Sequence, residues 1–163
     1  MSLPRGPVRR GAAALLVAAA VVLPAAGCGG GPDRSADRSY VEAVNAAQND
    51  FADRFDRLSS RITPTSTPRQ DRRTLAQFQV AVDRVVRRLR AARPPERVRA
   101  LHARLIAEIS GYRAQIGAAR RAFASRDPQR VLAAQGRLVG AVNETGARVN
   151  RTIDDINRRL RDG

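Results

Sequence analysis

The chain is short of the side chains that most catalytic and metal sites require. It has one cysteine, one histidine, no tryptophan and no lysine in 163 residues, with two tyrosines and four phenylalanines. A lone cysteine excludes an internal disulfide, and a lone histidine leaves no site built from several imidazoles. No segment alternates polar and apolar residues as a strand does. The residues after Cys28 are enough for one small domain, which we expect to be all-α.

Motifs for cofactors and catalysis are also missing. None of the four glutamates, Glu42, Glu96, Glu108 and Glu144, has a histidine three residues later, which argues against a di-iron helical bundle. The sequence has no haem-attachment motif, no phosphate-binding glycine loop and no nucleophile elbow. His102 lies beside two leucines, and we interpret it as a residue at the border of an apolar stripe. We therefore predict no enzyme, no cofactor and no metal.

The longest hydrophobic run covers residues 11–23, which is too short to cross a membrane about 30 Å thick. Three arginines and no acid precede it, as in a signal peptide. The run is followed by Ala25, Ala26, Gly27 and Cys28. This stretch resembles the lipobox of a bacterial lipoprotein, although Ala25 stands where leucine is most usual.

The resemblance implies that residues 1–27 are a signal peptide and that Cys28 is lipidated and becomes the first residue. It places the protein on the extracytoplasmic face of the cell membrane. Ordinary secretion and an uncleaved anchor are the alternatives, and the export route, general or twin-arginine, stays open. The Ala- and Arg-rich composition is similar to small predicted lipoproteins of high-GC Gram-positive bacteria.

Residues 28–38 are expected to form the lipidated cysteine and a flexible tether, and residues 39–163 a domain of four helices. Apolar residues recur at spacings of three and four in each helix, which we expect at about residues 39–62, 68–92, 95–125 and 128–161. Two capping boxes, Ser39 with Glu42 and Thr67 with Gln70, mark helix starts, and Asp127 with Pro128 marks another. The alternative for the first helix is a start one turn earlier, near Asp33. Short loops predict an antiparallel up-down-up-down four-helix bundle with coiled-coil-like packing.

The fourth helix carries two sevenfold repeats. Its predicted core positions are Leu132, Val139, Gly146, Ile153 and Leu160. A ladder of Asn143, Asn150 and Asn157 flanks them, one position after a valine or isoleucine. Asparagines beside a helix seam can hydrogen-bond across it and fix the register, although they could instead line a polar groove.

Positive charge is in excess. Of 30 basic residues three precede Cys28, so that 27 face 15 acids in the remainder, a net charge of +12. Nucleic acid is not expected as a partner, because the few aromatic residues offer no stacking platform and the protein is expected outside the cell. A cluster around the turn between the second and third helices is a candidate contact for lipid head groups or a partner: Arg84, Arg87, Arg88, Arg90, Arg93, Arg97 and Arg99.

These observations favour a membrane-anchored, non-enzymatic interaction module that docks a protein or an anionic envelope polymer. The alternative is a carrier that holds a small apolar ligand between its helices. A connected apolar pocket of a few hundred Å³ would favour the carrier. The oligomeric state, the partner and the biological process do not follow from the sequence.

Overall fold

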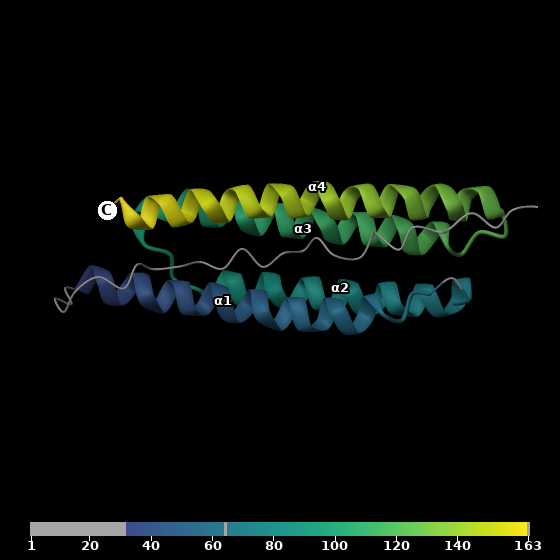
Figure 1. Ribbon diagram of the computed structural model, residues 1–163, viewed down its shortest axis with the longest axis horizontal. Helices are drawn as coiled ribbons and strands as arrows, with labels where there is room; N and C mark the ends of the chain where they lie inside the picture. The colour runs from purple at the N-terminus through teal and green to yellow at the C-terminus, as the bar shows by residue number, and fades with distance from the viewer. Residues whose placement is uncertain (1–31, 64, 163) are drawn as a thin grey trace, which may run out of the picture.

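The computed structural model describes residues 32–63 and 65–162, and these residues form four long helices packed against each other (Figure 1). Their bounds are α1 Pro32–Ser59, α2 Pro68–Ala91, α3 Arg99–Ala122 and α4 Pro128–Arg161. A short 3₁₀ helix, η1 Glu96–Val98, leads directly into α3. The described residues contain no strand, so the all-α prediction is confirmed. No described helix combines the length and the hydrophobicity needed to cross a membrane.

The start of α1 differs from the prediction. The helix begins at Pro32, so Ser39 lies inside it and does not cap it with Glu42. Proline suits the first turn of a helix, where its missing N–H leaves no bond unmade. Asp37, Tyr40 and Val41 are all buried, and these tertiary contacts extend the helix beyond the local start signal. The expected tether of residues 28–38 is correspondingly shorter, because its last seven residues belong to α1.

The other start signals are confirmed. The Thr67 side chain accepts a hydrogen bond from the Gln70 backbone N–H, and the Gln70 side chain accepts one from the Thr67 N–H in return. The Asp127 side chain accepts a hydrogen bond of 2.9 Å from the Gln129 N–H at the start of α4. A cap of this kind contributes about 1 kcal/mol of helix stability.

The apolar spacing of three and four is buried along α2, whereas the predicted core of α4 is buried only in its second half. In α2 all the stripe residues are buried: Leu75, Phe78, Val82, Val85 and Leu89. In α4, Gly146, Ile153 and Leu160 are buried, but Leu132 and Val139 are 63% and 45% exposed. The first half of α4 packs against the core through Val131, Ala134 and Leu138 instead, so Leu132 and Val139 lie off the packed face.

The reason lies in how the helices contact each other. Extensive contacts join helices that follow one another in the chain, α1 with α2, α2 with α3 and α3 with α4, whereas the described parts of α1 and α4 share no comparable interface. Figure 1 shows the α1–α2 and α3–α4 loops at one end of the molecule, here called the open end. The connection from α2 to η1 lies toward the other end, with the last residues of α4, and we call this the closed end.

Candidate functional site

An apolar groove lies between α1 and α4, on a floor made by α2 and α3. It has an internal volume of about 80 Å³ and takes residues from all four helices. Its lining residues are Ala47, Gln48, Phe51, Ala52, Val85, Leu89, Leu105, Ile109, Tyr112, Val142, Thr145, Val149, Asn150 and Ile153. Because it is an apolar space to which all four helices contribute, this groove is the candidate binding site.

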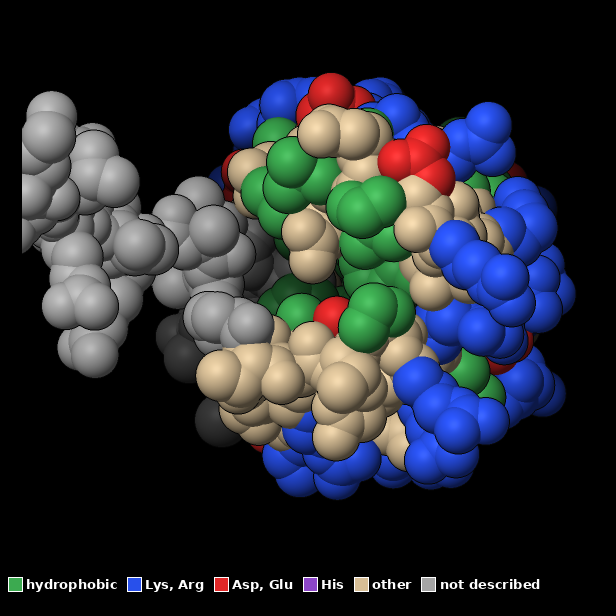
Figure 2. Space-filling view, turned by 90° about the vertical axis from the view of Figure 1, so that its right-hand side faces the viewer, with side chains coloured by type: hydrophobic (Ala, Val, Ile, Leu, Met, Phe, Trp, Pro, Cys, Tyr) green, Lys and Arg blue, Asp and Glu red, His purple; other side chains and the backbone are tan. Residues whose placement is uncertain are grey.

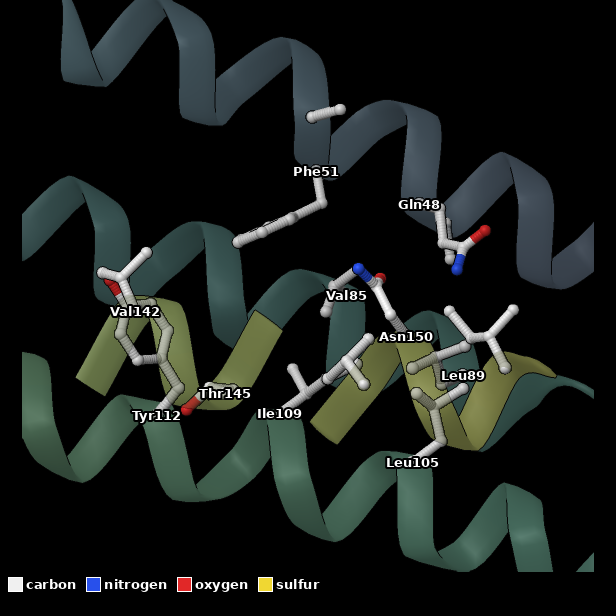
Figure 3. Close-up of a pocket in the computed structure, with 14 residues that line it drawn as sticks. Gln48, Phe51, Val85, Leu89, Leu105, Ile109, Tyr112, Val142, Thr145 and Asn150 are labelled. Atoms are coloured by element: carbon white, nitrogen blue, oxygen red, sulfur yellow. The ribbon is translucent and has the colours of Figure 1, made fainter. Parts of the chain in front are cut away.

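Two aromatic side chains reach the groove from opposite sides (Figure 3). Phe51 extends into it from α1, and Tyr112 extends toward it from α3 on the opposite side. Burial raises the pKa of the Tyr112 hydroxyl to about 12, so that this group stays protonated at physiological pH. The other polar lining groups are an amide on each outer helix, Gln48 and Asn150, and the Thr145 hydroxyl. No lining residue carries a formal charge.

Exposed apolar side chains lie on α4 between the groove and the open end. Val139 and Leu132 precede Gly146 by seven and fourteen residues, so they lie on the same edge of the helix. Figure 2 looks onto the open end and shows a hollow with hydrophobic side chains around it. An unpaired apolar edge beside a hollow is the kind of surface that binds another molecule.

The asparagine ladder follows the same edge of α4, and burial changes along it. Asn157 is 8% exposed, Asn150 is half-buried in the groove lining, and Asn143 is exposed. The structure therefore places one member of the predicted polar seam in the interior and one at the groove. The seam and the polar groove wall both stay predictions for this ladder.

The predicted arginine cluster divides into paired and exposed members. Arg97 pairs with the buried Asp37 at the start of α1, and Arg99 pairs with Glu96. Arg88 is 4.0 Å from Asp50 and donates to the Ala46 carbonyl at 3.4 Å.

Of the remaining members, Arg84 is half-buried, whereas the other three are exposed: Arg87, Arg90 and Arg93. These three form no ion pair with a described residue, so their guanidinium groups are available to an external anion. None of the seven lines the groove.

His102 is a core residue, which corrects its expected position at the border of a stripe. It is 5% exposed, its Nε2 lies 2.9 Å from the Leu89 carbonyl, and its Nδ1 lies 3.2 Å from the Tyr40 hydroxyl. A carbonyl only accepts, so Nε2 carries the proton and Nδ1 accepts from Tyr40. Burial lowers the pKa of His102, which favours this neutral form. The ring thereby ties α1, α2 and α3 together.

The groove walls and the Tyr40–His102 contact were missed at the sequence level. Tyr40 and His102 are 62 residues apart, and nothing in their local sequence connects them. One pattern in the sequence could have indicated the groove. Apolar Leu132 and Val139 lie on the same edge of α4 as the three asparagines Asn143, Asn150 and Asn157.

Cys28 and the lipobox residues Ala25, Ala26 and Gly27 lie outside the described residues. Within residues 32–63 and 65–162, no group of three or more His, Cys, Asp or Glu residues is arranged to hold a metal ion. No protein-family model matches the chain, and no curated protein and no solved structure matches it either.

Proposed function

We propose that the protein is a lipid-anchored, extracytoplasmic, non-enzymatic binding module built as an antiparallel up-down-up-down four-helix bundle. The position of the loops in Figure 1, at alternating ends along the chain, supports this topology. The lipobox-like stretch ending in Cys28 supports the anchor. Three glycines, Gly29–Gly31, separate Cys28 from α1 in sequence. The helices therefore start close to the membrane surface, with the closed end nearest to it.

The binding site that we propose is the groove between α1 and α4. The observation that carries this proposal is that α1 and α4 share no extensive interface, and that the apolar residues lining the space between them, Phe51, Val142 and Val149, stay partly exposed. A protein that needed only stability would close this seam, because each apolar residue removed from water adds about 1.5–3 kcal/mol. The open seam is thus suited to a partner that completes it.

The exposed arginines at the closed end support a second contact, with anionic head groups or an envelope polymer. Arg87, Arg90 and Arg93 would face the membrane in this orientation and attract it at low salt. We expect Arg87→Ala with Arg90→Ala to weaken binding of the Cys28→Ser protein to phosphatidylglycerol vesicles. The matched control, Arg130→Ala with Arg137→Ala in the first half of α4, is expected to leave that binding unchanged.

The anchor is tested by the mass of the protein extracted from its own membrane. A mass that starts at Cys28 and includes covalent acyl chains is expected. A chain that carries a free thiol would contradict the anchor, and Cys28→Ser is expected to release the domain from the membrane.

The groove is tested by photocrosslinking in cells. Replacing Phe51 with p-benzoylphenylalanine puts the probe on the groove wall, and replacing Val80, which is 58% exposed on α2, puts the same probe outside it. A discrete adduct of defined mass is expected from position 51 and not from position 80. Equal adducts at the two positions, or none at position 51, would refute the groove as a binding site.

A further inference from the structure

A cleft separate from the groove lies on the surface between α1 and α2. It has a volume of about 460 Å³ and shares no lining residue with the groove. Four of its lining residues, Arg57, Arg61, Gln77 and Val80, are exposed, so the cleft is open to solvent. A volume of about 300–1,000 Å³ is usual for sites that hold small molecules. This cleft therefore has the room and the access that a ligand needs.

The cleft continues toward the open end into a recess of about 410 Å³, because Arg61 and Gln77 line both. We call the two together the arginine cleft, and its lining residues lie within 54–63, 65–66 and 70–84. On α2 the lining runs from Gln70 to Arg84, which is about 21 Å at 1.5 Å per residue. One small ion would fill only part of this length, whereas a linear molecule can lie along it.

Arginine supplies the charge of this cleft. None of its described lining residues is an aspartate or glutamate, and five are arginines: Arg54, Arg57, Arg61, Arg73 and Arg84. Arg54 pairs with Asp50 at 3.1 Å, but the other four form no ion pair with a described residue. Arg61 donates a hydrogen bond of 3.0 Å to the Gln77 side chain, which holds it over the junction of cleft and recess. Four guanidinium groups in one cleft attract an anion.

The acidic residues near the arginine cleft lie outside its lining. Asp83 pairs with Arg113 of α3 at 2.7 Å. Asp71 is buried and accepts a hydrogen bond of 2.6 Å from Ser66. Asp53 and Asp56 are exposed on α1 and line neither the cleft nor the recess. An anionic ligand can therefore contact the arginines without meeting a carboxylate in the cleft.

The neutral groups of the cleft favour phosphate. The recess presents hydroxyl and amide groups beside its arginines: Thr63, Thr65, Ser66, Thr74, Gln70 and Gln77. Arginine together with serine, threonine and glutamine side chains is the set that holds phosphate oxygens in nucleic-acid complexes. No described lining residue is aromatic, so the cleft offers no platform for stacking bases. Buried Leu58 and Ala81 form an apolar floor for the uncharged atoms between phosphates.

We propose that the arginine cleft binds a linear phosphodiester polymer of the cell envelope. Successive phosphates contact Arg57, Arg61, Arg73 and Arg84, and the uncharged linkers lie over the floor. This site differs from the groove and from the closed-end arginines, so the inference goes beyond the proposed function. It rests on the proposed function in one point. The open end faces away from the membrane there, so a polymer reaches the cleft and lipid head groups do not.

The test uses the protein taken from its own membrane in a mild non-ionic detergent, with fluorescent poly(glycerol phosphate) as the probe. Arg57→Gln with Arg84→Gln removes two of the four arginines that lack an ion pair. The matched control is Arg137→Gln with Arg151→Gln, which removes two exposed arginines of α4 that line neither the cleft nor the groove. Circular dichroism confirms the fold of each variant.

Binding by the unchanged protein should weaken steeply with salt. At a log–log slope of about −0.7 per phosphate contact, as for single strands, four contacts lower the affinity roughly 50-fold between 50 and 200 mM salt. With two contacts left, the fall is roughly 7-fold. We expect the smaller fall in Arg57→Gln with Arg84→Gln and the full fall in the control.

A second pair of variants tests the same site without removing an arginine. Val80→Glu places a negative charge in the cleft, and Val80→Gln places a neutral side chain of the same shape there. Because Val80 is 58% exposed, both variants are expected to fold. The glutamate should weaken binding severalfold relative to the glutamine. Equal binding by the two variants would overturn the inference.

Other outcomes would also overturn it. These are an equal loss in the α4 control, a loss confined to Arg87→Gln with Arg90→Gln, and tighter binding of polygalacturonate or single-stranded DNA at equal charge. Binding of inorganic phosphate as tight as that of the polymer would show a single-ion site and would count against it as well.

Failure of this inference and failure of the proposed function are distinguishable. The anchor is tested by the mass of the extracted protein, and the groove by crosslinking at position 51, and neither result depends on the arginine cleft. In cells, a polymer captured by the probe at position 80 would give a ladder of masses. The groove is expected to give one adduct of defined mass, so the two sites have different readouts.

Discussion

The closed end and the open end of the molecule share the sevenfold apolar repeat of α4 but differ in how far its residues are buried. At the closed end the sevenfold apolar spacing of α4 is buried, and Ile153 is 1% exposed. At the open end the same spacing leaves Leu132 63% exposed. The closed end also has cross-helix polar contacts, His102 with Tyr40 and Arg97 with Asp37. An apolar repeat thus indicates which residues of a helix can be buried. The packing of the neighbouring helices determines which of them are buried.

The largest expected effect comes from truncating the same repeat at its two ends. Ile153→Ala should lower the free energy of unfolding by about 2–5 kcal/mol, since it removes buried methyl groups and leaves a cavity. Leu132→Ala should change it by no more than about 0.5 kcal/mol, because the side chain is mostly in water. Urea unfolding of the two variants measures both values. Equal losses would show that Leu132 is buried in the protein in solution.

A smaller effect is expected at the polar contact of the closed end. Tyr40→Phe keeps the ring and removes the hydroxyl, so that the buried Nδ1 of His102 loses its donor. We expect a loss of about 1–3 kcal/mol in the free energy of unfolding. Phe55→Tyr, which adds a hydroxyl to a partly buried ring, is not a matched control. Tyr112→Phe is the matched control, because the Tyr112 hydroxyl forms no hydrogen bond with the described residues and faces the groove. A loss in Tyr40→Phe no larger than in Tyr112→Phe would count against the contact.

Near the open end, replacing glycines of α4 by alanine should raise the free energy of unfolding. A Cβ added at Gly136 or Gly140 in α4 would meet no atom within 4 Å. Each change to alanine should therefore raise the free energy of unfolding by about 1 kcal/mol through helix propensity. Gly117→Ala is the comparison, since its Cβ would lie 3.1 Å from Gln79 Nε2 and the side chain would have to move. Thermal unfolding measures the stability of each variant. If Gly136→Ala does not raise the stability, another group packs closely against Gly136 in solution.

The smallest expected effect is a pH dependence located at the closed end. Burial lowers the pKa of His102 in the folded protein below the ordinary value of about 6.5, so the unfolded chain binds the proton first as the pH falls. The stability due to neutral His102 is complete above pH 6.5 and is lost as the pH falls toward the folded pKa. Unfolding measured between pH 8 and pH 5 should show this loss, and His102→Gln should reduce it. An unchanged slope in that variant would assign the dependence to another group.

Local chemistry predicted much of the fold. The Thr67–Gln70 box, the Asp127 cap and the apolar spacing of α2 depend on neighbours in sequence, so the pattern alone located these elements. The capping box at Ser39 was wrong, because burial of Tyr40 and Val41 extends α1 past Ser39 to Pro32, close to the alternative start near Asp33. Tertiary packing outweighs a local cap when the residues ahead of the cap are covered.

By itself the sequence determined that the protein is helical and where most of its helices begin and end. It also fixed the excess of arginine and the scarcity of catalytic side chains. Only the tertiary structure decided that α1 and α4 stay apart, that Leu132 and Val139 are exposed, and that His102 is buried. Helix positions follow from contacts over three or four residues, whereas an open seam depends on how helices far apart in the chain pack against each other.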